Sequence, residues 1–365
     1  MRICFIALGE FSHVDPYIEF FSEQGHQTSF VALAPGPPRR VPTFNVGCNA
    51  RLGKMLGKYT YLPSMLRARR VVRSLKPDIV HAHYATSAGL AARVVNFHPW
   101  LVTAHGTDVT LGVQSSLWRG ILQRIFSEAD CVNTVSNDLR RMVLSLGTPP
   151  EKVETFTLGI DTNLFPFREG SCPAQGGMLR LICTRRLEPV YDHATIIKGM
   201  AELKNRGVPF RLTLVGEGKT RPVLEQLVRD LGLGAEVTFA GAVPNRELPK
   251  YLSQNDIYLS ASVRDGASLC LLEAMAAGLF PIVSRITANA EWIQDGDNGL
   301  LHDVGDPEKL AQCIISHSSL GERRREILRR NRQLVLERGD RARNMQRLEG
   351  IYEALVARRS TQVAA

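Results

Sequence analysis

Short apolar runs alternate with longer amphipathic stretches along most of the chain. In the first half the apolar runs predict strands at "RICFIAL", "TSFVAL", "DIVHAH", "WLVTAH", "CVNTV" and "VETFTL". Beyond Met178 the pattern predicts strands at "LRLICT", "FRLTLVG", "EVTFAG", "DIYLSAS", "FPIVS" and "GLLH". Helical patterns separate most of these runs; one of them begins at a capping Ser136 and stops at Gly147. This alternation is typical of α/β proteins with parallel sheets.

The alternation is interrupted near residues 166–178, where "FPFREGSCPAQGGM" is rich in Pro, Gly and polar residues. This stretch is the best linker candidate, and 365 residues suffice for two domains with separate cores. We therefore expect two doubly wound, Rossmann-like domains facing each other across a cleft, over residues 1–168 and 179–345. A C-terminal helix, residues 346–365, is expected to cross back to the first domain. Ligands of such sheets bind beyond the carboxyl ends of the strands.

Composition and cysteine spacing favour a globular protein of a reducing compartment. The chain is 44% hydrophobic, and its seven scattered cysteines form no C-x-x-C pair. Neither a disulfide framework nor a zinc site is indicated, so we expect reduced thiols. The N-terminal apolar run is short and has no cleavage-like site, and no later run approaches the roughly 20 apolar residues of a membrane span. We therefore expect a cytoplasmic protein.

The formal charge of +9 is unevenly spread, with an acid-free interval between Glu23 and Asp78. Ten cations lie there: Arg39, Arg40, Arg51, Lys54, Lys58, Arg67, Arg69, Arg70, Arg73 and Lys76. Interleaved aromatic and aliphatic residues favour peripheral docking on the anionic cytoplasmic face of a membrane. Nucleic acid is the competing partner, but no recognition motif accompanies the charge, so none is expected. The alternative to docking is a helix face that serves only solubility, since "LRARRVVRSLK" also carries an ordinary core stripe.

The stretch "DGASLCLLEAMAAG", residues 265–278, places the carboxylate of Glu273 among leucines and alanines. The residues "GAS" after Asp265 predict a loop that turns into a helix. A helix N-terminus presents unpaired N–H groups and the positive end of a dipole. The stretch therefore suits an anion at its mouth, with Glu273 one turn inside to bind hydroxyl groups.

Eight motifs occur in the order in which one known family has them. They are "PDIVHAHYA", "TAHGTD", "LGIDTNLF", "RRLEP", "LVGEG", "VTFAGAVPNRELPKYLSQNDIYLSAS", "DGASLCLLEAMAAGLFPIVS" and "DGDNGLL". In these motifs the sequence resembles the GT-B glycosyltransferases of family 4 over nearly the whole chain, most specifically over residues 236–301. The resemblance implies a retaining glycosyltransferase that moves a sugar from a UDP- or GDP-linked donor to a hydroxyl of a glycan, lipid-linked or small-molecule acceptor. It also implies that the C-terminal domain holds most of the donor.

The resemblance assigns the donor site residue by residue. Asp265 would lie near the sugar hydroxyls, Glu273 on the ribose diol, and Arg186 on the diphosphate. The other donor-binding candidates are Gly266, Ala267, Ser268, Arg185, Gly216 and Glu291. Two positions depart from the family pattern: Asp265 replaces a more usual glutamate, and Tyr191 stands where a lysine partner of Arg186 is usual. Three alternatives follow from Tyr191: Arg185 or a nearby lysine compensates, backbone N–H groups hold the leaving group, or activity is weak.

The acceptor side is assigned to the first domain. His105 in "TAHGTD" follows an apolar strand, and by resemblance it faces the donor sugar. With Arg186 and Asp265 it completes the expected catalytic set. Gly9 and His13 lie in the loop after the first strand and are assigned to the acceptor pocket. The family often has a Gly-Gly pair in that loop, whereas this chain has one glycine.

No metal and no cofactor are expected. The triplet "DGD" at residues 295–297 matches the acid-x-acid pattern of a metal-binding motif. However, Asn298 and Gly299 follow it, which is typical of a turn. Two other classes of function stay open. One is a nucleotide-sugar epimerase of the same fold, which needs acid/base residues around the sugar. The other is a non-catalytic nucleotide-sugar-binding protein, which the replacement at Tyr191 leaves open.

Overall fold

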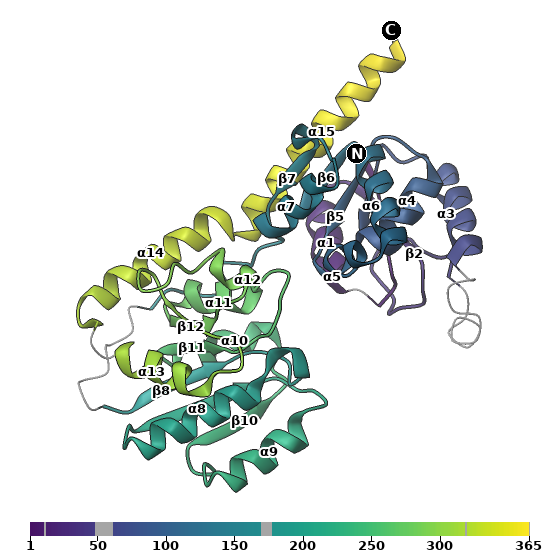
Figure 1. Cartoon of the computed structure of the whole chain (residues 1–365). Coiled ribbons are helices and arrows are strands. Elements are labelled where there is room, and N and C mark those ends of the chain that lie inside the picture. Colours follow the sequence, from purple (N-terminus) through teal and green to yellow (C-terminus); the bar gives the residue numbers. More distant parts are fainter. Residues whose placement is uncertain (11, 48–60, 169–176, 318–319, 365) are drawn as a thin grey trace. The chain divides into compact units, whose positions relative to one another are not determined.

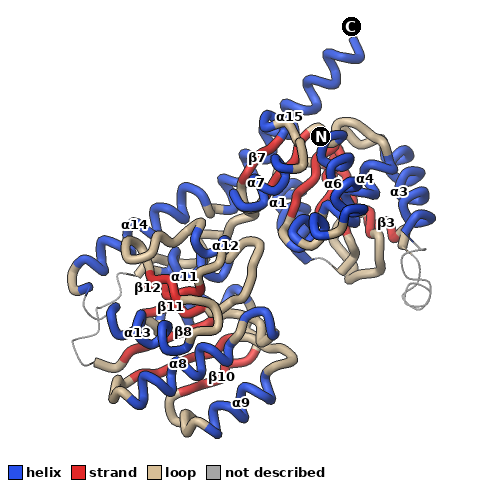
Figure 2. Tube along the Cα trace, in the orientation of Figure 1, coloured by secondary structure: helices blue, strands red, loops and turns tan. Residues whose placement is uncertain are grey.

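The computed structural model describes residues 1–10, 12–47, 61–168, 177–317 and 320–364. The chain forms two compact units (Figure 1): unit 1 comprises Met1–Thr157 and Ala342–Ala365, and unit 2 comprises Leu158–Arg341. Each unit contains one parallel sheet, with helices outside its strands (Figure 2). This confirms the expected class of two doubly wound α/β domains.

Unit 1 is built around a seven-stranded parallel sheet in the order β3-β2-β1-β4-β5-β6-β7. Its strands are β1 (Arg2–Ala7), β2 (Gln27–Ala32), β3 (Thr43–Asn45), β4 (Ile79–His83), β5 (Trp100–Ala104), β6 (Cys131–Thr134) and β7 (Val153–Thr155). Its described α-helices are α1 (Asp15–Glu23), α3 (Tyr61–Leu75), α4 (Leu90–Val95), α5 (Thr107–Thr110), α6 (Ser116–Glu128), α7 (Asn137–Ser145) and α15 (Arg341–Ala364). The short helical turns η1 (Ser12–Val14), η3 (Ala85–Gly89), η4 (Gly112–Gln114) and η5 (Pro150–Lys152) complete it. The strand order reverses between β1 and β4, and sheets of this type bind ligands at such a reversal.

Unit 2 repeats this plan with a six-stranded parallel sheet in the order β10-β9-β8-β11-β12-β13. Its strands are β8 (Leu179–Cys183), β9 (Phe210–Val215), β10 (Val237–Gly241), β11 (Ile257–Ser260), β12 (Phe280–Ser284) and β13 (Leu300–His302). Its described α-helices are α8 (His193–Asn205), α9 (Arg221–Asp230), α10 (Leu248–Ser253), α11 (Leu269–Ala277), α12 (Thr287–Ala290), α13 (Pro307–His317) and α14 (Arg323–Arg338). Two 3-10 turns, η6 (Pro189–Tyr191) and η7 (Asn245–Glu247), precede α8 and α10. Here the order reverses between β8 and β11.

Most strands lie where apolar runs predicted them, because a strand of a doubly covered sheet is buried on both faces. Every residue of β4, β5 and β12 is buried. Strand β3 was not predicted: it is a three-residue edge strand with no buried side chain, so it leaves no apolar run. Helix α7 begins as expected, since Ser136 Oγ accepts the Leu139 N–H at 3.3 Å, and Gly147 follows its end with φ +87°.

The chain passes from unit 1 to unit 2 between residues 157 and 158, before the expected linker near 166–178. Of that linker, residues 169–176 lie outside the described residues. Ile160 and Phe165 are buried in the core of unit 2 together with residues of α11. Residues 158–168, expected in the first domain, are therefore part of the second one.

The C-terminal helix α15 packs within unit 1. Its side chains Met345, Leu348 and Tyr352 are fully buried, and the Tyr352 hydroxyl lies 2.5 Å from His81 Nδ1 on β4. The return to unit 1 falls at Ala342, earlier than the expected start of the crossing helix at residue 346. Neither α15 nor any other helix of the described ranges is long and apolar enough to cross a membrane.

Candidate active site

The residues selected from the sequence lie at the carboxyl ends of strands in both units. In unit 1, Gly9 follows β1 and His105 follows β5. In unit 2, Arg185 follows β8, Gly216 follows β9 and Asp265 follows β11. Because the carboxyl ends of parallel strands share one edge of a sheet, each unit carries its own cluster of candidate residues there.

A buried ion pair lies at the start of α11 in unit 2. The Arg185 guanidinium donates to Asp265 Oδ2, and only 8% of the Arg185 side chain is exposed. Ser268 Oγ lies 3.3 Å from the same guanidinium nitrogen and donates to Asn289 Oδ1 at 2.7 Å. Asp265 Oδ1 accepts the Gly266 N–H at 2.8 Å, so both carboxylate oxygens are engaged. These charge-assisted bonds fix the loop that leads into α11.

Arg185 also lies over the residue that replaces the family's lysine. Its guanidinium carbon is 4.8 Å from the centre of the Tyr191 ring, within the range of a cation–π contact. Its Nε has no hydrogen-bond partner among the described residues. A buried cation with an unused donor therefore stands next to Tyr191.

Arg186, the neighbour of Arg185, is not part of this buried pair. Its side chain is 76% exposed, and its guanidinium lies 3.5 Å from the Glu188 carboxylate. Together with Tyr191 and Arg264 it helps to line an open pocket of about 620 Å³. The two consecutive arginines thus differ: Arg185 is fixed and buried, whereas Arg186 is exposed and pairs with Glu188.

Glu273 is buried one turn inside α11. Its carboxylate accepts a long hydrogen bond from Asn245 Nδ2 at 3.5 Å. Burial raises the pKa of Glu273 to about 7, and the nearby Arg185 guanidinium and Asn245 amide only partly offset this rise. The carboxyl is therefore divided between its protonated and ionised forms near neutral pH. Ala267 forms the turn into the helix, where its carbonyl accepts the Leu269 N–H at 3.0 Å.

Gly216 is packed against the end of the strand that carries Arg185. Its φ is +149°, and a Cβ at this position would lie 2.3 Å from the Arg185 carbonyl oxygen. Any larger residue would displace that strand end. Gly216 therefore shapes the site through its lack of a side chain.

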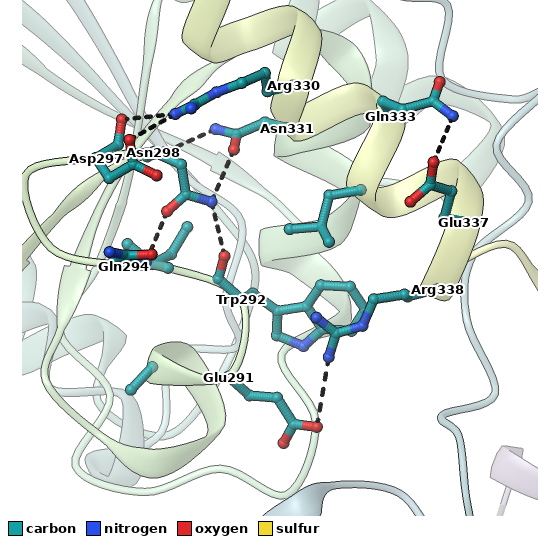
Figure 3. A pocket seen from close by; sticks show the side chains of 13 residues that line it. Glu291, Trp292, Gln294, Asp297, Asn298, Arg330, Asn331, Gln333, Glu337 and Arg338 are labelled. Atoms are coloured by element: carbon teal, nitrogen blue, oxygen red, sulfur yellow. Dashed lines mark hydrogen bonds and ion pairs between the residues drawn. The ribbon is translucent and has the colours of Figure 1, made fainter.

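Glu291 lies in another pocket of unit 2, a cavity of about 520 Å³ between the end of α12 and α14 (Figure 3). Its carboxylate is 3.9 Å from the Arg338 guanidinium, which also lies over the Trp292 ring at 4.9 Å. The α12 residue that bonds the loop before α11 is Asn289, the fully buried partner of Ser268. No motif pointed to Asn289; the only signal was a polar residue between two alanines in "TANA".

The acid-x-acid triplet at residues 295–297 forms a turn, as predicted. Gly296 has φ +76°, and its N–H donates to the Gly299 carbonyl at 2.9 Å. Asp295 pairs with Arg285 at 2.5 Å. Among the residues that the structure describes, no group of three or more His, Cys, Asp or Glu side chains is arranged to hold a metal ion.

In unit 1 a buried carboxylate holds the loop that carries His105. Asp108 accepts the N–H groups of Gly106 at 2.8 Å, Ala85 at 2.7 Å and His105 at 3.2 Å. Burial raises the pKa of Asp108, and these N–H bonds act against the rise. Gly106 has φ +136°, a conformation that favours glycine. The His105 ring is thus placed just beyond β5, where burial lowers its pKa to about 3 and keeps it neutral.

The loop after β1 reaches His105 through His13. The two imidazole rings are stacked with their centres 6.3 Å apart. Gly9 is pressed against the neighbouring chain, because a Cβ there would lie 2.1 Å from the Ala34 carbonyl oxygen. Its own carbonyl accepts a hydrogen bond from Arg39 at 3.1 Å. The structure therefore brings Gly9, His13 and His105 to the same edge of the sheet.

Two further residues also meet His105; both lie in the motif "PDIVHAHYA", which assigned neither of them a role of its own. Tyr84 has φ +88°, a conformation that costs about 1–3 kcal/mol for a residue other than glycine. Its ring stacks on His105 with centres 6.3 Å apart, and its hydroxyl bonds to Thr107 Oγ1. His83 Nδ1 lies 3.2 Å from His105 Nε2. The available signal was "HAHY" at the end of a predicted strand, where the last side chains reach the carboxyl edge.

Comparisons with known proteins match both halves of the chain. Two family models apply: Glycosyltransferase Family 4 over residues 12–164 and Glycosyl transferases group 1 over residues 173–334. The N-acetyl-alpha-D-glucosaminyl L-malate synthase of Bacillus anthracis is 28% identical over 332 residues, which cover 84% of this chain and 85% of its own. The GDP-mannose-dependent alpha-(1-6)-phosphatidylinositol monomannoside mannosyltransferase of Mycolicibacterium smegmatis is 26% identical over 272 residues, covering 69% of this chain and 71% of its own. The solved structure of HepE from Anabaena, in complex with UDP, has a TM-score of 0.80 at 16% identity and covers 97% of this chain and 100% of its own.

The two parallel-sheet units and the likeness to solved structures define the class of protein, which is the GT-B fold. The family matches on both halves go one step further. The chain belongs to the family 4 glycosyltransferases, and the resemblance carried by its motifs is confirmed.

Proposed function

We propose that the protein is a metal-independent, retaining glycosyltransferase that moves a sugar from a nucleotide-sugar donor to a hydroxyl of a glycan, lipid-linked or small-molecule acceptor. The observation that carries this proposal is the buried Arg185–Asp265 pair beside Ser268 and Glu273 at the start of α11. Such a site brings a desolvated cation close to carboxylates that can bind hydroxyl groups, which a sugar diphosphate requires. The names of the relatives support the reaction class.

Unit 2 binds the donor in this proposal. Glu273 accepts hydrogen bonds from the ribose diol, and Arg186 swings from its exposed position onto the diphosphate. Arg185, stacked on Tyr191, supplies the positive charge that the absent lysine would give. The donor is linked to UDP or GDP: HepE is solved with UDP, and the Mycolicibacterium enzyme is named for GDP-mannose.

The proposed reaction is a front-face displacement, in which the acceptor hydroxyl enters on the side from which the diphosphate leaves. Negative charge grows on the leaving diphosphate as the glycosidic bond breaks, and Arg186 together with N–H groups at the start of α11 stabilises it. A leaving phosphate oxygen takes the proton of the attacking hydroxyl, so the reaction needs no separate base. Neutral His105 orients a sugar hydroxyl by hydrogen bonding.

Unit 1 binds the acceptor, with Gly9 and His13 beside His105. A lipid-linked acceptor has to be met at a bilayer, and α3 offers a surface for docking on an anionic cytoplasmic leaflet. It exposes Arg67, Arg70 and Arg73 next to Leu66, which is 49% exposed. Arg39 does not belong to this surface, because it is largely buried and pairs with Asp15 at 2.5 Å. The cations Arg51, Lys54 and Lys58 lie outside the described residues.

One assay tests this function against its alternatives. The purified protein is incubated with UDP- and GDP-linked sugars and candidate acceptors, with and without EDTA, and the products are followed by NMR. Transfer with retained anomeric configuration supports the proposal, and inverted configuration contradicts it. An epimerised nucleotide sugar without transfer identifies the epimerase, and binding without turnover identifies the non-catalytic protein. Metal independence fails if EDTA abolishes activity and Mn²⁺ or Mg²⁺ restores it.

A further inference from the structure

A row of four histidine rings runs through unit 1, and the proposed reaction uses only its outer part. His81 and His83 lie on one face of β4 with ring centres 4.0 Å apart. His105, just beyond the neighbouring β5, is 5.5 Å from His83, and His13 is 6.3 Å from His105. His81 and His83 are almost completely buried, whereas His105 is partly exposed. The row therefore connects the core to the edge of the sheet where ligands bind.

The two buried histidines have different hydrogen bonds. His81 uses both ring nitrogens: Nδ1 lies 2.5 Å from the Tyr352 hydroxyl and Nε2 lies 2.7 Å from Thr103 Oγ1. His83 uses one, since Nδ1 lies 3.2 Å from His105 Nε2, and its Nε2 has no partner in the described part of the chain. His83 is also the hydrogen-bond partner that the described residues provide for the His105 ring. The ring of Tyr17 packs edge-on against His83 at 4.5 Å and holds it in place.

The protonation of these two rings follows from their burial. Burial, with the neighbouring imidazoles as a second cause, lowers the pKa of His83 well below its usual range, and burial lowers the pKa of His105 to about 3. Both rings are therefore neutral at pH 7, and a hydrogen bond between them contains one proton. If His105 donated that proton, His83 Nδ1 would accept it, and the single ring proton of neutral His83 would sit on Nε2 as a buried N–H without an acceptor in the described residues. Proteins avoid such an N–H more strictly than an unused lone pair. The favoured state has His83 Nδ1–H donating to His105 Nε2.

We propose that His83 is a positioning residue that fixes the orientation and the tautomer of His105, so that His105 carries its proton on Nδ1. The bond that one ring nitrogen makes decides which nitrogen bears the proton. His105 then presents an Nδ1–H donor to a ligand, because its Nε2 is occupied by His83. This role rests on the proposed glycosyl transfer for its effect on catalysis, while the tautomer itself is a property of the protein without ligands.

Nitrogen NMR of the imidazole rings tests the tautomer directly. In the wild type, ¹⁵N–¹H correlation spectra are expected to show His105 with its proton on Nδ1 between pH 6 and 8. In His83→Phe, which keeps a ring but has no donor, His105 is expected to shift toward the Nε2–H tautomer that free imidazole prefers. His83→Asn places an amide N–H near the former Nδ1 and is expected to restore the wild-type pattern. A wild-type His105 with its proton on Nε2 overturns the proposal, even if both variants fail to fold.

Steady-state kinetics of His83 variants provide the second test of the proposal. Replacing His83 by Phe is expected to lower kcat by about tenfold to a hundredfold with little change in donor KM, since a misplaced group costs rate more than binding. His83→Asn is expected to recover most of the loss. The matched control is His81→Asn, in the same buried row but bonded to Tyr352 and Thr103: it is expected to lower the melting temperature and leave the His105 tautomer unchanged. If no donor supports transfer, the proposed function fails and the NMR result still decides the role of His83.

Discussion

At the carboxyl edge of the sheet in unit 1, His105 is surrounded by other aromatic and imidazole rings, whereas the corresponding edge in unit 2 carries the Arg185–Asp265 ion pair. In unit 1, burial keeps the imidazoles of His83 and His105 neutral. In unit 2, the buried Arg185 stays charged because a guanidinium does not lose its proton in proteins, and Asp265 is its counter-ion. Desolvation acts on both edges, and the intrinsic pKa of each group decides the outcome at pH 7. An imidazole, with an ordinary pKa of about 6.5, loses its charge on burial, whereas a guanidinium keeps its charge and needs a counter-ion.

This difference teaches how one architecture can be adapted to two ligands. A neutral edge with hydroxyl and imidazole groups can orient an uncharged alcohol without changing its charge. A charged edge with an unused guanidinium donor can accept an anion, because it already carries fixed charge where water is excluded. Glu273 lies between the two cases, since it is buried in the charged edge and yet partly protonated near pH 7.

The largest expected effect comes from removing a charge of the buried pair. Asp265→Asn leaves Arg185 buried without its counter-ion, and we expect the free energy of unfolding to fall by about 3 kcal/mol. Urea titration measures this change in the free energy of unfolding. The matched control is Asp297→Asn, whose side chain is 40% exposed and pairs with Arg330 at 2.8 Å. That exposed pair should contribute less than about 1 kcal/mol. If both variants lost the same free energy of unfolding, the Arg185–Asp265 pair would contribute no more to stability than an exposed pair does.

The second-largest effect is expected on kcat at Arg186, which is compared with an exposed arginine outside the proposed site. Arg186→Ala is expected to lower kcat by about a hundredfold or more, because a donor aimed at the leaving group acts in the transition state. Its melting temperature should not change, since the side chain is exposed. Arg246→Ala is the control, an exposed arginine on η7 of the same unit, and it should leave kcat unchanged. A lowered melting temperature that accounts for the lost activity would make Arg186 structural.

Glu273→Gln tests the ribose contact of the charged edge. It is expected to weaken binding of a nucleoside diphosphate by roughly 1.5–3 kcal/mol, the range for a hydrogen bond to a charged group. Isothermal titration calorimetry at pH 8, where the wild-type carboxyl is ionised, gives the cleanest comparison. An unchanged dissociation constant would remove Glu273 from the donor site.

The pH dependence of nucleoside diphosphate binding is a second test of the assignment of Glu273. In the proposed donor site the ionised carboxylate accepts the ribose hydroxyls, and burial raises the pKa of Glu273 to about 7 before the ligand binds. Binding therefore favours loss of this proton. Affinity should be flat above pH 7 and should fall by up to about tenfold per unit below it, as one linked proton requires. The Gln variant should show no such slope from this group, and a wild-type slope of the opposite sign would contradict the assignment.

The smallest effect per residue is expected on the outer surface of α3. Replacing Arg67, Arg70 and Arg73 by Gln should weaken binding to phosphatidylglycerol vesicles by at most about 1 kcal/mol per cation, and the wild-type binding should weaken with salt. Co-sedimentation measures both. A control triple variant replaces exposed arginines of unit 2: Arg229, Arg246 and Arg325. Equal binding to neutral vesicles, or none at all, would leave α3 as a solubilising surface.

The sequence predicted the strands and the loop before α11 because these depend on local patterns. Ser136 and the helix it caps could be located from a few neighbouring residues. The Arg185–Asp265 pair could not, since the two residues are far apart in the sequence and meet only because β8 and β11 are neighbours in the sheet. The strained Tyr84 and the partners of His83 also depend on side chains delivered by other strands. Charges and motif positions could thus be predicted from the sequence, whereas the pairings among them required the fold.

Helix α15 also bears on the order in which the protein is assembled. Unit 1 consists of two stretches of chain separated by the whole of unit 2, and Tyr352 of the second stretch stacks on Phe21 and bonds His81 in the first. A ribosome that has made the first 157 residues has not yet supplied that part of the core. Unit 2 is continuous and can close as soon as it emerges, although nascent chains usually complete their N-terminal domain first. The N-terminal domain of this protein is therefore the last to be finished.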